Sequence, residues 1–116
     1  MMKRIKALVT KLSGHRGNEY YNILCYAVFV ALSFQPAEPQ MKVICSEVKK
    51  YIKKDAGSIS KSISRAVNDI WENGSRETLF EIYGKELQEK PSPKDVVYVM
   101  AQYLWINEKE ETAESV

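Results

Sequence analysis

The sequence contains a single histidine and only two cysteines, Cys25 and Cys45. Both cysteines stand inside apolar runs and lack the spacing of metal ligands, so we expect buried free thiols in a reducing compartment. His15 lies in a short glycine-flanked link, far from any cysteine or acid at ligand spacing, and should be a plain surface residue. No glycine-rich phosphate loop, nucleophile elbow or histidine-based metal motif is present. These absences argue against an enzyme and against a metal or any other cofactor.

Long apolar runs are scarce as well. The longest one extends from Ile23 to Leu32, and as a helix it would span roughly 15 Å, about half of a bilayer core. The first lysines and arginines lead into an amphipathic repeat, whereas a signal peptide would continue with an apolar stretch. We therefore expect no membrane span and a cytoplasmic protein.

Acidic residues are nearly missing from two segments, although the net charge is only +2. Residues 1–17 hold five lysines and arginines and no acid, and residues 49–65 hold six against one acid. The last ten residues reverse the sign, with four glutamates against one lysine. We expect residues 1–116 to form one domain, in which 107–116 is an acidic, frayed tail.

Apolar residues recur at helical spacing in six segments, and no segment is a convincing strand. The pattern predicts an all-α bundle of about six helices. Gly14 should end the first helix, Asn18 and Ser75 should begin the second and the fifth, and Ser92 followed by Pro93 should begin the last. The expected helices cover residues 3–12, 19–34, 40–54, 58–73, 76–83 and 93 onward.

The stretch "GSISKSISRAVNDIW", residues 57–71, fits both the residue spacing of a strand and that of a helix. Its alternating serines suggest a strand, but a strand would place Lys61 between Ile59 and Ile63 on the core side. A helix instead puts the apolar residues on one stripe: Ile59, Ile63, Ala66, Val67, Ile70 and Trp71. We therefore predict a helix over residues 58–73, with Ser58 as its N-cap and Lys61, Arg65 and Asn68 on its outer side.

The segments 40–54 and 58–73, joined by a tight "DAG" turn, predict a helix-turn-helix. In this interpretation the second helix enters the major groove of double-stranded DNA, while the first helix meets phosphates. Base contacts are expected from Lys61, Arg65, Ser60, Ser64 and Asn68, and phosphate contacts from Ser58, Lys49, Lys50, Lys53 and Lys54. The alternative is that any helical bundle contains such pairs, and that the lysines form an ordinary solvated face.

Three motifs carry a resemblance to a known family. They are "SISKSISRAVNDIW" running without a gap into "WENGSRETLFEIYG", the later "KPSPKDVVYVMAQYL", and the earlier Gly14 with "YYNILCYAV". Over about Leu12 to Glu108 the chain resembles the C-terminal DNA-binding effector domain of the sporulation initiation response regulators of spore-forming Firmicutes. That family shows a recognition helix closing on Trp, then W-x-x-G, a short helix ending in aromatic-Gly, and a Lys-Pro-led last helix.

The resemblance implies a six-helix domain with a helix-turn-helix that binds repeated DNA boxes at promoters, often as a head-to-tail pair. It also implies contact with an RNA polymerase sigma factor. Lys61 falls where the family has a base-contacting arginine, and Arg65 where it has another polar DNA-facing residue. Ser60 and Ser64 replace a glutamate and an arginine of the family's DNA face.

The family's receiver domain has no counterpart in these 116 residues, so we expect no control by aspartyl phosphorylation. This difference and the serine substitutions leave a second hypothesis open. In it the chain is a non-enzymatic interaction module of the same fold that binds a full-length regulator or an RNA polymerase subunit. An uninterrupted positive face would favour DNA, whereas Asp69, Glu72 or the acidic tail lying across that face would favour a protein.

Overall fold

The computed structural model describes residues 1–14 and 18–114, and over these residues the chain is all-helical, with no strand. The predicted fold class is confirmed. His15 lies outside the described residues, so its expected surface position stays a prediction. The helices are α1 (Met2–Ser13), α2 (Glu19–Phe34), α3 (Met41–Val48), α4 (Ala56–Asn73), α5 (Arg76–Tyr83) and α6 (Pro93–Glu114).

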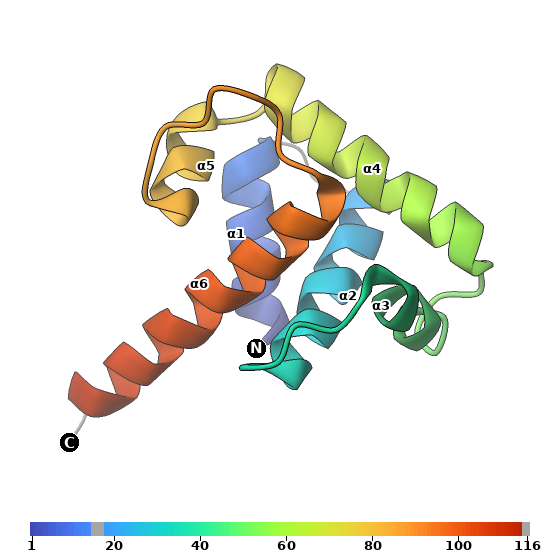
Figure 1. Ribbon diagram of the computed structural model, residues 1–116, viewed down its shortest axis with the longest axis horizontal. Coiled ribbons are helices and arrows are strands. Elements are labelled where there is room, and N and C mark those ends of the chain that lie inside the picture. Colours follow the sequence, from blue (N-terminus) through green and yellow to red (C-terminus); the bar gives the residue numbers. More distant parts are fainter. Residues whose placement is uncertain (15–17, 115–116) are drawn as a thin grey trace.

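Helix α2 lies at the centre of the bundle (Figure 1), where it packs against α1, α3, α4 and α6. Its sequence is apolar on almost every side, so it is stable in water only when neighbouring helices cover it. Its most fully buried residues, each with none of its surface exposed, are Ile23, Leu24, Ala27 and Val28. The central position predicted for this segment is confirmed.

Three helix ends follow the signals in the sequence. Gly14 ends α1 in the left-handed conformation, at φ 71°, and its N–H donates to the Thr10 carbonyl at 2.8 Å. The Ser75 hydroxyl oxygen accepts the Thr78 N–H at 3.1 Å at the start of α5. The Ser92 hydroxyl oxygen accepts the Asp95 N–H, also at 3.1 Å, at the start of α6.

Helix α3 is shorter than predicted, because it ends at Val48 and residues 49–55 form a connection of turns and bends. Here the N–H groups of Lys50 and Tyr51 donate to carbonyls three residues back rather than four. A continuing helix would stack the four lysines of residues 49–54 at three- and four-residue spacing, where like charges repel. Tyr51 is 53% exposed and stacks on Tyr26 with ring centroids 5.2 Å apart.

Helix α4 begins earlier than predicted, and its N-cap is Asp55 rather than Ser58. The Asp55 carboxylate accepts the Ser58 N–H at 2.8 Å. Its bonds to the Ser58 N–H and hydroxyl are the main cause that lowers the pKa of the Asp55 carboxyl. A carboxylate is a strong hydrogen-bond acceptor at a helix N-terminus, so the helix begins after Asp55 rather than after Ser58.

The C-terminal end of α4 contacts the C-terminal end of α1. The Ser75 N–H donates to the Leu12 carbonyl at 2.8 Å. A Cβ atom at Gly74 would lie 2.5 Å from that same carbonyl oxygen, so only glycine fits between the two segments. The "WENG" motif of the sequence therefore marks the point where α1 meets the corner between α4 and α5.

Helix α6 continues to Glu114, so the described part of the predicted frayed tail is helical. Its N-terminal end lies close to α4, and the helix then runs away from α4 to the opposite side of the molecule (Figure 1). Within residues 1–14 and 18–114, no helix combines the length and the apolar character needed to cross a membrane.

Candidate nucleic-acid interface

Helix α4 separates its apolar and polar residues as predicted. Ile59, Ile63 and Ala66 are fully buried. The outer side presents Lys61, Arg65 and Asn68, all exposed, at three- and four-residue spacing, so they form one stripe. Ser60 is exposed and Ser64 half-buried beside this stripe. The structure therefore places the predicted base-contact residues on the solvent side of one helix.

The lysines predicted for phosphate contact lie in the 49–55 connection, which leads directly into the first turn of α4. Lys50 pairs with Glu47 at 2.8 Å and Lys54 with Glu19 at 2.9 Å, while Lys49 and Lys53 are exposed. The bond to Glu47 raises the pKa of the Lys50 ammonium. Surface ion pairs of this kind are weak, so both paired lysines can exchange their carboxylates for phosphates.

Ser58, also predicted to hold a phosphate, has its backbone N–H committed to Asp55. The carboxylate occupies the N-terminus of α4, which would otherwise be a ready anion site. Phosphate binding at this end therefore depends on the lysines of residues 49–54 more than on the helix terminus.

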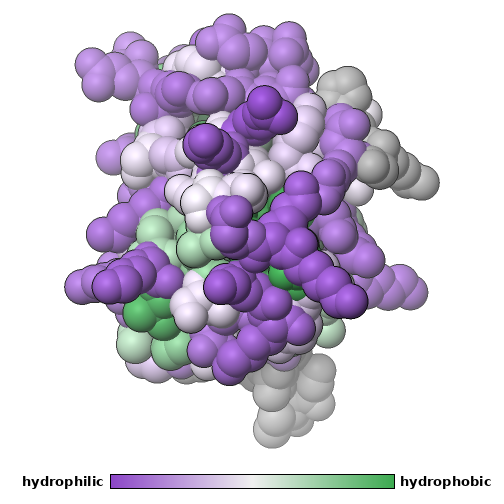
Figure 2. All heavy atoms as spheres, turned by 90° about the vertical axis from the view of Figure 1, so that its right-hand side faces the viewer, coloured by the Kyte–Doolittle hydropathy of each residue, from purple (hydrophilic) through white to green (hydrophobic). Residues whose placement is uncertain are grey.

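Figure 2 faces this end of the molecule. Hydrophilic side chains cover most of the surface, and hydrophobic ones gather in the lower half of the view. The exposed hydrophobic residues of the described chain include Val43 in α3, at 39%, and Tyr51 in the connection, at 53%. Polar groups thus cover the upper part of this face, the side on which α4 lies in Figure 1.

The acids of α4 lie at its C-terminal end, beyond the cations. The Asp69 carboxylate accepts hydrogen bonds from the Tyr21 hydroxyl of α2 and from the Asn73 amide, the latter at 2.9 Å. Glu72 is exposed on the outer stripe, one turn beyond Asn68. Neither acid lies between Lys61 and the lysine-rich connection, and α6 carries the acidic tail away from this face (Figure 1).

One cation of this face comes from outside the predicted helix pair. Lys90, in the link between α5 and α6, donates from its ammonium group to the Asn68 side-chain oxygen. The sequence holds no local signal for this contact, because the two residues are far apart in the chain. Lys90 thus extends the basic stripe next to Asn68.

An open hollow of about 450 Å³ adjoins the outer stripe of α4. Arg65 shares this hollow with both acids of the helix. Its lining residues are Tyr20, Arg65, Asn68, Asp69, Glu72 and Asn73.

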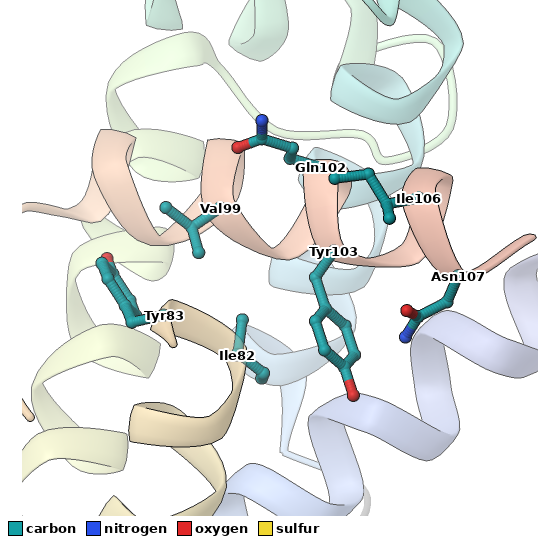
Figure 3. Close-up of a pocket in the computed structure, with 7 residues that line it drawn as sticks. All are labelled: Ile82, Tyr83, Val99, Gln102, Tyr103, Ile106 and Asn107. Atoms are coloured by element: carbon teal, nitrogen blue, oxygen red, sulfur yellow. The ribbon is translucent and has the colours of Figure 1, made fainter. Parts of the chain in front are cut away.

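A second hollow, of about 200 Å³, lies between α5 and α6 (Figure 3). Val99 and Tyr103 of α6 point toward Ile82 of α5, and the Tyr83 hydroxyl donates to Asp95 at 2.7 Å. Ile106, which also lines this hollow, is 43% exposed. No lysine or arginine lines this hollow, so it is chemically different from the α4 face.

No family model and no curated protein matches this chain. Among the described residues, no group of three or more histidine, cysteine or acidic side chains could hold a metal ion. Cys25 and Cys45 are buried free thiols, as predicted, and burial raises the pKa of Cys25 to about 11. A thiol with this pKa is protonated at neutral pH and is a poor nucleophile.

Proposed function

We propose that the chain is a sequence-specific regulator of transcription in the cytoplasm that binds double-stranded DNA through α4. The observation that carries this proposal is the charge arrangement at the start of α4. Lys61 and Arg65 are exposed beside a connection with four lysines. The one acid of this connection, Asp55, is bonded to the Ser58 N–H as the helix cap, and Asp69 and Glu72 lie toward the other end of α4. Binding of the phosphate backbone requires such a cationic face, and base readout requires long polar side chains beyond it.

In the proposed complex, the N-terminal half of α4 lies in the major groove and the α3–α4 pair acts as a helix-turn-helix. Lys61 and Arg65 would donate to guanine O6 and N7, and Ser60, Ser64 and Asn68 would contact neighbouring base edges. The lysines of residues 49–54 would hold phosphates. The resemblance to the sporulation effector domains supports this arrangement, together with head-to-tail pairing on DNA and contact with a sigma factor.

Selection of bound duplexes from a random library tests the proposal, followed by anisotropy titrations at two salt concentrations. We expect an enriched motif, and we expect Lys61→Ala to weaken binding to that motif more than binding to other sequences. Lys3→Ala, which removes an exposed lysine from α1, is the matched control and should leave the preference unchanged. An absence of any enriched motif, with binding no tighter than to heparin, contradicts sequence-specific recognition.

The hollow between α5 and α6 favours a second candidate function. Its lining combines aliphatic and tyrosine side chains with two amides, and together with the 43% exposed Ile106 it suits a protein partner, here a full-length regulator or an RNA polymerase subunit. Purified RNA polymerase immobilised on a sensor tests this. Ile106→Glu should abolish capture while Lys61→Ala leaves it intact, and the opposite result would exclude this surface as the interface.

A further inference from the structure

Arg65 has an acidic residue one turn away on its own helix. Asp69 follows it by four residues in α4, the spacing at which oppositely charged side chains form ion pairs. Both side chains line the same open hollow. Nevertheless, no ion pair joins Arg65 to any residue that the structure describes.

The Asp69 carboxylate is instead held from another direction. One of its oxygens accepts the Tyr21 hydroxyl and the other accepts the Asn73 amide. Tyr21 is only 3% exposed and belongs to the central helix α2, so its hydroxyl is a fixed donor. Burial, and next the bond to Asp69, raises the pKa of the Tyr21 hydroxyl, which therefore keeps its proton at neutral pH.

We infer that Tyr21 is a positioning residue for the DNA face: it holds the Asp69 carboxylate against α2 and thereby leaves the Arg65 guanidinium available to DNA. The inference rests on the proposed function, because it assigns a role at the same site. Without the Tyr21 hydroxyl, the carboxylate loses its donor from α2, and we expect it to turn toward Arg65. It would then neutralise a base-contacting cation and add a negative charge near the phosphates.

Tyr21→Phe tests the inference, because it removes the hydroxyl and keeps the buried ring. In anisotropy titrations at low salt with a duplex chosen by library selection, we expect binding about threefold to tenfold weaker than for the native protein. This loss is smaller than the effect of deleting a base-contacting cation outright. The double variant Tyr21→Phe/Asp69→Asn should regain native affinity, because an amide cannot neutralise Arg65. Failure of the double variant to recover, at an unchanged urea midpoint, would overturn the inference.

A second measurement needs no DNA. The pKa of Asp69 can be followed through its carboxyl carbon by NMR in the native protein and in Tyr21→Phe, each with and without Arg65→Gln. We expect Arg65→Gln to raise the Asp69 pKa in the Tyr21→Phe background and to leave it unchanged in the native one. Equal effects in both backgrounds would overturn the inference. If the native protein selects no duplex, the proposed function fails, and this titration still decides whether Tyr21 separates the two side chains.

Discussion

The two halves of α4 differ in what holds them. The first half, up to Arg65, exposes Ser60, Lys61 and Arg65 on its outer side, and the Asp55 cap holds its first turn. In the second half, Tyr21 binds Asp69, and the Arg76 guanidinium lies 4.0 Å from the centroid of the Trp71 ring. Both halves therefore bury an apolar stripe in the core, and the second half is also tied to neighbouring helices by polar side-chain contacts.

This difference shows how a helix can offer a precise contact surface without being buried. A binding site is accurate when the element that carries it is fixed elsewhere by packing and hydrogen bonds. Ile59, Ile63 and Ala66 pack the inner side of α4 into the core along the stretch expected to meet DNA, and polar contacts around residues 69–76 hold its C-terminal end. Substitutions on the buried side or at the C-terminal end should therefore change stability, and substitutions of the exposed residues of the first half should change binding.

The largest expected effect is on stability, at the C-terminal end of α4. Gly74→Ala would place a Cβ atom 2.5 Å from the Leu12 carbonyl oxygen, so α1 and α4 must move apart. We expect the free energy of unfolding in urea to fall by about 3 kcal/mol. Gly84→Ala is the control: it strains a residue at φ 74° without meeting any atom within 4 Å, and should cost only about 1 kcal/mol. Equal losses in the two variants would show that the contact with Leu12 is unimportant.

The next largest effect is on DNA binding by the first half of α4. Lys61→Ala should weaken binding to the selected duplex by about 1–3 kcal/mol and relax the base preference, without changing the urea midpoint. Lys61→Arg sharpens this test, because an arginine can donate two parallel hydrogen bonds to one guanine. It should retain the preference, and a loss as large as that of the alanine variant would contradict a base contact here.

A smaller effect is expected in the connection that precedes α4. Lys53 is exposed, so Lys53→Ala should weaken binding to all duplexes alike. The slope of log K against log salt should flatten by roughly one unit, because one fewer counterion is released. Anisotropy titrations from low to moderate salt measure this slope, and a change of base preference would assign Lys53 to the bases instead.

The smallest effect concerns the first turn of α4 and depends on pH. The pKa of Asp55 is lowered by its bonds to Ser58, so its carboxylate stabilises the fold above its ordinary pKa of 3.8. This contribution disappears as pH falls from 3.8 through the lowered pKa of the folded state. The difference in urea midpoint between the native protein and Asp55→Ala should therefore be present at neutral pH and vanish in acid. A difference that persists in strong acid would show that the charge of Asp55 is not the cause.

The sequence predicted the helices well where local chemistry decides. Gly14, Ser75 and Ser92 act within one turn of the helix that they begin or end, so their effects can be inferred from neighbouring residues alone. The apolar stripe of α4 was predicted for the same reason, because its spacing excludes a strand that would bury Lys61.

The errors arose where two local signals compete or where distant residues meet. Near the start of α4, Asp55 and Ser58 are both good caps, and the stronger acceptor begins the helix. The lysines of residues 49–54 fit a helical pattern, but their mutual repulsion opposes it. Lys90 and Tyr21 reach the α4 face from other parts of the bundle, and no periodicity in a single sequence reveals such contacts.

The meeting of Leu12 with the corner after α4 limits how far this protein can be trimmed. A peptide containing only α3 and α4 would carry almost every side chain expected to touch the duplex. It would lack the contact between Leu12 and the corner after α4, the Tyr21 hydroxyl that restrains Asp69, and Lys90 beside Asn68. We expect such a minimal peptide to be largely unstructured in water, so a miniature DNA reader built from this chain would have to keep α1, α2 and the start of α6.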